Sequence, residues 1–253
     1  MTLGYKTRGN GPQKLLFLHG WLSDYTVYDE IIPYFDEDLY TAVFADYRGY
    51  GLSSHLKGDY SIDEIAGDVL DLAQAIGWDR CHIIGHSMAG MVMQRVACLN
   101  EDLLVSCIAV TPVPASGLPL DADTAAFFRK SAEDDDALAD LFDALTGQQY
   151  SKTFNKKMAA RARAALSKEA MLGYFDAWTK TDFSADVAKL DTKILVIAGE
   201  LDGGVGPAVL AETCMKQLKN AEMKVIGGAG HYPMQETPVR LFTLIEEHLE
   251  HYA

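Results

Sequence analysis

Residues Ile83–Gly90, with the sequence IIGHSMAG, form an apolar run that stops at Ser87 among small residues. A serine in this position is typical of the turn from a strand into a helix, where a strained backbone exposes the hydroxyl. Gly85 permits the sharp turn because it has no Cβ. The usual pattern is Gly-x-Ser-x-Gly, and Ala89 departs from it by one methyl group. Ser87 is therefore a candidate nucleophile, and a serine that merely begins a helix is the alternative.

Short apolar runs recur along the chain and alternate with helical or turn-rich segments. Nearly continuous apolar strands in this alternation predict an α/β fold, with a mostly parallel sheet and helices on both faces. Helices are expected at Ile62–Ile76, Met88–Leu99 and Val239–Leu249. The predicted strands are Leu15–His19, Tyr40–Ala45, Cys81–Gly85, Val105–Thr111, Ile194–Ala198 and Met223–Ile226.

The alternation is interrupted between Pro112 and about Ala185, where the pattern predicts only helices, near Thr124–Ala144 and Ser151–Trp178. Helices inserted at this point are expected to form a cap over the carboxyl ends of the strands, where ligands bind in α/β folds. We therefore divide the chain into a core, residues 1–112 and 186–253, and an inserted helical cap, residues 113–185.

The cap carries two clusters of opposite charge, which we interpret as solvated helix faces. Recognition of a charged substrate is the alternative interpretation. The acidic cluster is Glu133–Asp136, and the basic cluster is Lys156, Lys157, Arg161 and Arg163.

A nucleophilic serine requires an acid and a histidine at the ends of later strands. Asp202 follows the predicted strand Ile194–Ala198, and His231 lies in a glycine-rich loop after the last strand. Loops above a rigid sheet commonly carry catalytic groups. Glu200 is the nearest alternative to Asp202.

The remaining histidines have other expected roles. His19 and His86 are expected to support the site rather than act as bases. His248 and His251 lie near the end of the last helix, where the helix dipole attracts a cation. We expect no metal site at these two histidines.

Five motifs occur in one order along the chain: LHGW (18–21), DYRGYGLS (46–53), GHSMAG (85–90), GELD (199–202) and GHYP (230–233) with Glu236 and Pro238. Together they resemble the α/β-hydrolase superfamily, in its serine-esterase-like branch with a helical cap. The resemblance covers nearly the whole chain outside the cap. It implies that Ser87, Asp202 and His231 form a catalytic triad, and that the backbone N–H groups of Trp21 and Met88 form an oxyanion hole.

The resemblance also narrows the chemistry. Haloalkane dehalogenases and epoxide hydrolases of this branch carry an aspartate at the turn where this chain has Ser87. We therefore expect hydrolysis of a small or medium-sized carboxylic ester through an acyl-enzyme. Carbon–carbon bond hydrolysis of a β-diketone or ring-cleavage product, lactone hydrolysis and perhydrolysis use the same triad and stay open. A ligand receptor on this fold is the non-enzymatic alternative.

Aromatic residues of the cap are candidates for an apolar substrate pocket, although packing of the cap onto the core is an equally good interpretation. The expected substrate-binding residues are Trp21, Phe128, Phe142 and Trp178. The reaction needs no cofactor and no metal ion.

The chain has 253 residues and a net charge of −14, which argues against a basic face for nucleic acid or anionic membranes. The expected partner is a small ester-like molecule, and the oligomeric state is left open. Four cysteines without a CxxC pair, and an N-terminal stretch without an apolar core, favour a cytoplasmic protein. No apolar run approaches the roughly 20 residues that span a bilayer.

Overall fold

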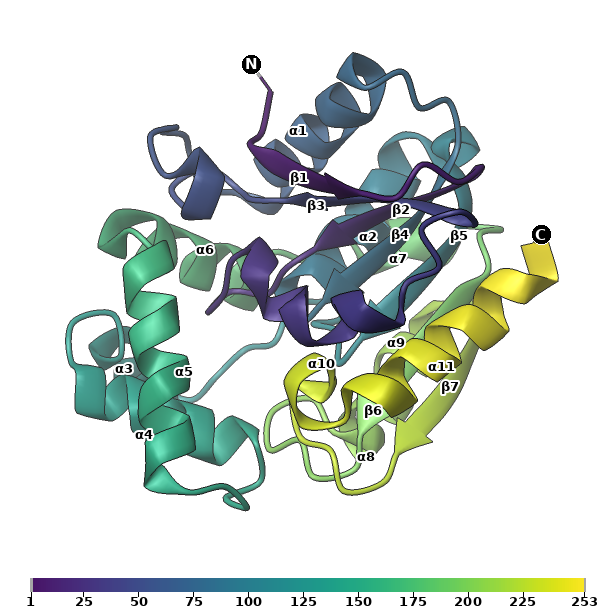
Figure 1. The fold of residues 1–253 in the computed structure, drawn as a ribbon. Helices are drawn as coiled ribbons and strands as arrows, with labels where there is room; N and C mark the ends of the chain where they lie inside the picture. The colour runs from purple at the N-terminus through teal and green to yellow at the C-terminus, as the bar shows by residue number, and fades with distance from the viewer. Residues whose placement is uncertain (1, 253) are drawn as a thin grey trace.

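The computed structural model describes residues 2–252 and contains a seven-stranded sheet flanked by helices (Figure 1). The strand order is β1-β3-β2-β4-β5-β6-β7, in which β1 is antiparallel to β3 and all other neighbours are parallel. The predicted α/β fold with a mostly parallel sheet is confirmed. The strands are β1 (Tyr5–Arg8), β2 (Gln13–Leu18), β3 (Tyr40–Ala45), β4 (Cys81–His86), β5 (Leu104–Val110), β6 (Ile194–Gly199) and β7 (Ala221–Ile226).

Strands β2 to β7 correspond to the six predicted strands, with ends that differ by at most two residues. Strand β1 was not predicted, because all four of its side chains are exposed and it lacks an apolar run. Strand β4 lies between β2 and β5 and is buried along its whole length. Ser87 therefore follows an inner strand of the sheet, at its carboxyl end.

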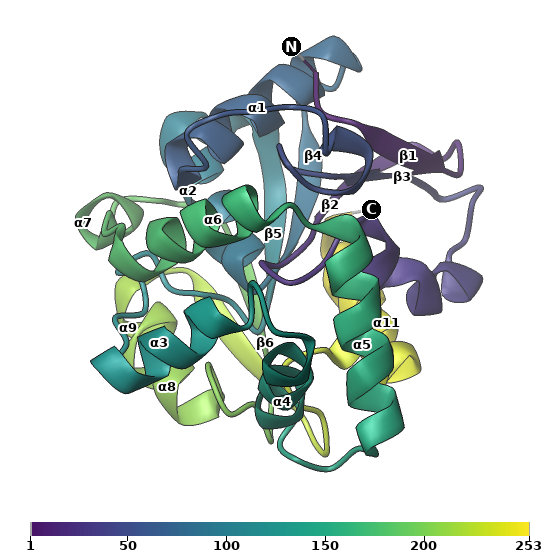
Figure 2. The ribbon, with the colours of Figure 1, turned by 90° about the vertical axis from the view of Figure 1, so that its left-hand side faces the viewer.

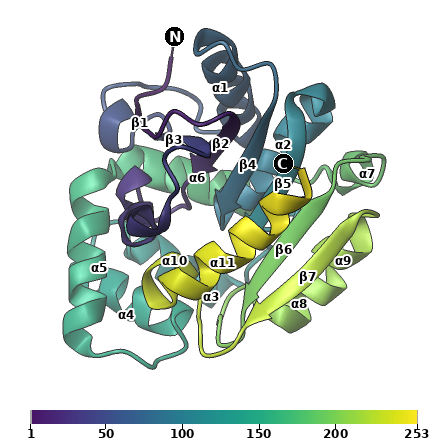
Figure 3. The same ribbon diagram turned by 45° about the vertical axis from the view of Figure 1, so that its right-hand side comes forward.

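Helices cover both faces of the sheet, with α11 and the 3-10 helix η1 packed together on one face and α1 beside α2 on the other (Figure 3). The predicted helix start at Ile62 is confirmed, since the Ser61 hydroxyl accepts a hydrogen bond from the Glu64 N–H (3.1 Å). The core helices are η1 (Tyr25–Tyr34), η2 (Gly51–Ser53), α1 (Ile62–Ala75), α2 (Met88–Leu99), η3 (Glu101–Leu103), α7 (Ser184–Val187), α8 (Pro207–Glu212), α9 (Cys214–Gln217), α10 (Pro233–Glu236), α11 (Pro238–Leu249) and η4 (Glu250–Tyr252).

Four helices, α3 to α6, lie between β5 and α7 and stand in front of the sheet in Figure 2. Two helical pieces were predicted here, and the structure breaks each into two. Asp134 caps the start of α4 through the Ala137 N–H (2.9 Å), and Ser167 caps α6 through the Ala170 N–H (3.2 Å). The core and cap boundaries at residues 112 and 186 stay a prediction. The cap helices are α3 (Ala122–Lys130), α4 (Asp135–Leu145), α5 (Lys152–Ala165) and α6 (Lys168–Lys180).

All four cysteines are free thiols, and Cys81, Cys107 and Cys214 are buried. Burial raises the pKa of Cys81 and Cys214 to about 12, so both thiols stay protonated at neutral pH. Across residues 2–252, no helix combines the length and the apolar composition that a membrane crossing requires. The cytoplasmic location stays a prediction.

Candidate active site

Ser87 lies at the turn between β4 and α2 in a backbone conformation that few side chains adopt, with φ 55° and ψ −117°. The turn is tight on both sides. A Cβ on Gly85 would lie 2.4 Å from the carbonyl oxygen of Ala89, and one on Gly90 would lie 2.3 Å from the Cβ of Pro112. Glycine is therefore required at 85 and 90, whereas the methyl group of Ala89 is accommodated in the core.

The side chains of Ser87, His231 and Asp202 form one chain of hydrogen bonds. His231 Nε2 lies 2.9 Å from Ser87 Oγ, and His231 Nδ1 lies 2.7 Å from Asp202 Oδ2. The other carboxylate oxygen of Asp202 accepts hydrogen bonds from the N–H groups of Gly204 (2.8 Å) and Val205 (3.1 Å). With Nδ1 donating to the carboxylate, Nε2 is left as the acceptor for the serine proton.

The two other carboxylates near this chain hold the histidine loop. Glu200, the alternative acid, accepts a hydrogen bond from the N–H of Gly228 (2.8 Å). Glu236 accepts from the N–H groups of Gly230 (2.7 Å) and Tyr232 (2.7 Å), on either side of His231. The geometry thus brings Asp202 to the imidazole and leaves Glu200 and Glu236 to fix the backbone of the loop.

Two core residues hold the carbonyl oxygen of His231. His86 Nε2 donates to it (2.8 Å), as does the hydroxyl of Thr111 (3.0 Å), which lies in a left-handed conformation with φ 43°. Burial lowers the pKa of His86 far below its usual range, so its imidazole is neutral. The expected supporting role of His86 agrees with this contact. Thr111 was missed, because no local pattern marks a threonine whose partner lies in a distant loop.

His19 supports the loop that carries Trp21. Its Nδ1 donates to the carbonyl oxygen of Gly20 (2.9 Å), and burial lowers the pKa of His19 to about 4. The backbone N–H groups of Trp21 and Met88 donate to no acceptor within residues 2–252. Met88 is the first residue of α2, where such groups lack a helical partner. Both N–H groups are thus available to an anion, and the oxyanion hole stays a prediction.

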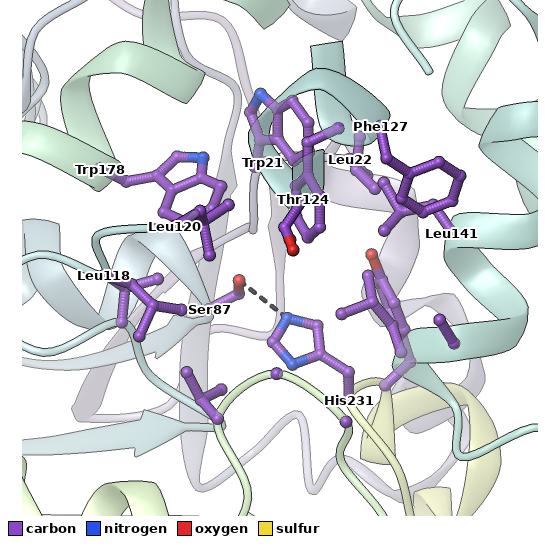
Figure 4. A pocket seen from close by; sticks show the side chains of 18 residues that line it. Trp21, Leu22, Ser87, Leu118, Leu120, Thr124, Phe127, Leu141, Trp178 and His231 are labelled. Atoms are coloured by element: carbon purple, nitrogen blue, oxygen red, sulfur yellow. Dashed lines mark hydrogen bonds between the residues drawn. The ribbon is translucent and has the colours of Figure 1, made fainter. Parts of the chain in front are cut away.

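A cavity of about 330 Å³ opens above Ser87 and His231, between the sheet and the cap (Figure 4). Of the four residues expected to bind substrate, Trp21, Phe128 and Trp178 line this cavity and Phe142 does not, and substrate binding by the first three stays a prediction. Phe142 is fully buried and packs on the ring of Tyr232, at 5.3 Å between centroids, because this side of α4 faces the core. Phe127, another aromatic residue of the cap, also lines it. Lining residues that were not predicted include Leu22, Leu118, Leu120, Thr124, Leu141, Leu145, Val205 and Tyr232.

Among residues 2–252, no Lys, Arg, Asp or Glu side chain lines the cavity. The charge clusters of the cap pair on the surface, with Lys156 3.7 Å from Asp136 and Arg163 2.8 Å from Asp135. Arg161 instead bonds to the core, 3.1 Å from Asp29. Surface pairing thus accounts for Lys156 and Arg163 with their acidic partners, whereas Arg161 anchors the cap to the core.

The expectation of a cation at His248 is wrong. Its Nε2 lies 3.0 Å from the hydroxyl of Ser106, and burial lowers its pKa to about 4, so the ring is neutral. His251 bonds to the carbonyl oxygen of Glu247 (2.8 Å). Within the described part of the chain, no group of three or more His, Cys, Asp or Glu side chains is arranged to hold a metal ion.

The sequence and the fold of this chain are similar to those of several known proteins. The sequence profile of the alpha/beta hydrolase fold matches residues 14–238. The chain is 27% identical to epoxide hydrolase 1 of Caenorhabditis elegans, over 99% of this chain and 67% of that protein. It is 26% identical to a non-heme haloperoxidase of Rhodococcus erythropolis, over 90% and 88% of the two chains. Its fold is similar to that of a bromoperoxidase from Bacillus anthracis, with a TM-score of 0.88, 21% identity and coverage of 97% and 94%.

Proposed function

The chain belongs to the alpha/beta hydrolase fold family of hydrolases, and from this membership we propose that it is a serine hydrolase acting on small or medium-sized carboxylic esters. The observation that carries the proposal is the Ser87–His231–Asp202 hydrogen-bond chain beneath an uncharged cavity. This is the arrangement that activates a serine hydroxyl for attack on an acyl carbon.

In the proposed reaction, Ser87 Oγ attacks the ester carbonyl while His231 Nε2 takes its proton. The carbonyl oxygen becomes an oxyanion, which the N–H groups of Trp21 and Met88 stabilise. Asp202 holds the imidazole in the required tautomer and stabilises the imidazolium. The imidazolium then protonates the departing alcohol oxygen as its bond to the acyl carbon breaks. Water, deprotonated by His231, hydrolyses the acyl-enzyme and restores Ser87.

The uncharged wall of the cavity favours neutral substrates. A ring-cleavage product with a carboxylate would need a cationic partner, and none of the described residues that line the cavity is a lysine or an arginine. At about 330 Å³, the cavity is at the small end of the range for ligand sites, about 300–1,000 Å³. These two properties support a neutral ester of small or medium size as the partner molecule.

The identity of the nucleophile favours ester hydrolysis over epoxide opening, although one relative is named an epoxide hydrolase. Epoxide hydrolases of this branch are expected to carry an aspartate at the position of Ser87, because a carboxylate opens the epoxide directly. A neutral hydroxyl with an adjacent base instead suits acyl transfer. Lactone hydrolysis and perhydrolysis would use the same Ser87 and are outcomes of the test below.

The test is hydrolysis of p-nitrophenyl esters of rising acyl length, beside a lactone, a β-diketone and a perhydrolysis assay. We expect turnover of the shorter esters, and a fall in kcat on the order of 10⁶ for Ser87→Ala. Ser54→Ala, at an exposed serine, is the matched control and should behave as wild type. Cleavage of the diketone but of no ester would overturn the esterase proposal. A halt after one turnover would instead indicate a receptor.

A further inference from the structure

The C-terminal end of cap helix α4 contacts the loop that carries His231. The carbonyl oxygen of Leu145, the last residue of α4, accepts a hydrogen bond from the backbone N–H of His231 (3.0 Å). On the other side of the same residue, His86 and Thr111 hold the carbonyl oxygen of His231. The backbone of His231 is thus fixed by the core at its C=O and by the cap at its N–H.

Two glycines allow α4 to approach this closely. A Cβ on Gly230 would lie 2.6 Å from the Cα of Thr146 and 2.9 Å from the carbonyl oxygen of Leu145. A Cβ on Gly203, beside Asp202, would lie 2.7 Å from the carbonyl oxygen of Ala144. These conflicting atoms belong to the backbone, so they cannot move aside as the end of a flexible side chain does. The last turn of α4 is therefore packed directly on the loop that carries Asp202 and on the loop that carries His231.

The same turn of α4 also lines the cavity. Leu141, Ala144 and Leu145 all contribute to its wall, and Figure 4 shows Leu141 beside Phe127, on the opposite side of His231 from Ser87. A substrate group that fills this side of the cavity presses on the helix whose last carbonyl holds His231. Because His231 protonates the leaving group, this side suits the alcohol part of an ester.

We propose that the last turn of α4 is a positioning element for His231. The Leu145 carbonyl and the close contact at Gly230 set the distance between His231 Nε2 and Ser87 Oγ. The fit of the substrate against Leu141 and Leu145 is thereby transmitted to the general base. This inference rests on the proposed function, since it assigns the cap a role in the same acyl transfer.

Gly230→Ala tests the contact, because the added methyl group forces α4 and the histidine loop apart. A misplacement of about 1 Å costs on the order of 10²-fold in rate. Gly227→Ala is the matched control on the same loop, since a Cβ there meets only Glu200 Oε2, at 3.7 Å. The readouts are kcat and KM for p-nitrophenyl butyrate and the rate at which a p-nitrophenyl alkylphosphonate labels Ser87.

We expect Gly230→Ala to lower both kcat and the labelling rate about 10- to 100-fold, with KM changed less than about threefold. Gly227→Ala should match wild type. A Gly230→Ala protein that matches Gly227→Ala, or that changes KM alone, would overturn the positioning role. If Gly230→Ala does not fold, Gly203→Ala carries the same test, because its conflict involves one carbonyl oxygen.

Labelling also separates the two proposals. A wild-type protein that cleaves no ester but reacts with the phosphonate contradicts the esterase proposal, and the labelling rates of Gly230→Ala and Gly227→Ala still decide the positioning role. A wild-type protein that does neither overturns both proposals, because Ser87 would then have no active base.

Discussion

Two carboxylates follow strand β6, and only one of them touches the imidazole of His231. Asp202 and Glu200 stand two residues apart, so a local pattern leaves both as candidates for the acid. The structure separates them, since Asp202 Oδ2 lies 2.7 Å from His231 Nδ1, whereas Glu200 accepts from the N–H of Gly228. The two carboxylates therefore have different contacts, and a substitution at each position can test whether they also have different roles.

Asp202→Asn is expected to lower kcat about 10⁴-fold, because the amide no longer holds the imidazole in the tautomer that accepts the Ser87 proton. Steady-state kinetics on the best p-nitrophenyl ester measure the loss. Glu200→Gln is the matched control and should stay within about threefold of wild type, since the amide oxygen still accepts from Gly228. Equal losses in the two variants would contradict the assignment of Asp202.

At the scale of helices and strands, local features were predictable from the sequence and packing was not. The turn at Ser87 could be predicted because a strand, a sharp turn and a helix are encoded within a few residues. The breaks before α4 and α6 were missed, because Asp134 and Ser167 interrupt segments that otherwise read as continuous helices. The contact of Leu145 with His231 joins distant segments, so no local pattern indicates it.

The choice between Phe128 and Phe142 as lining residues depends on packing in the same way. Helical periodicity shows that α4 has an apolar face, but the way in which the cap packs on the core decides which side chains reach the cavity. Leu141 lines it, and its neighbour Phe142 turns to Tyr232 in the core. The sequence therefore predicts a cap with an aromatic pocket but leaves one of its residues assigned to the wrong side.

Phe142→Ala should mainly lower stability, by about 3–5 kcal/mol, because it removes a fully buried ring. Preference among acyl lengths should be unchanged, since Phe142 does not line the cavity. Phe128→Ala is the contrasting variant: its ring is partly exposed and lines the cavity, so truncation should favour longer acyl chains at a smaller cost in stability. Urea unfolding and the ester panel measure both effects. A change of acyl preference in Phe142→Ala alone would contradict this prediction.

For the molecule as a whole, the buried histidines make the free energy of unfolding depend on pH. Burial lowers the pKa of His19, His82 and His248 to about 4, whereas in the unfolded chain these rings titrate near 6.5. Between these values the unfolded chain binds protons that the folded chain excludes, so the free energy of unfolding falls as the pH drops. Asp46 acts in the opposite sense: burial raises its pKa to about 7, which weakens the fold as the pH rises from about 4 to 7.

His82 allows this dependence to be tested at one position. It is nearly fully buried, and its Nδ1 lies 2.8 Å from the hydroxyl of Ser106, a contact that an asparagine amide can replace. From about pH 6.5 to about pH 4, His82→Asn should lose about 3 kcal/mol less of its free energy of unfolding than wild type does. Urea titrations across this range measure the difference. The control is His55→Asn, at an exposed histidine, whose free energy of unfolding should change with pH as that of wild type does. If the free energy of unfolding of His82→Asn also changes with pH as that of wild type does, the pKa of His82 is not lowered in the folded chain.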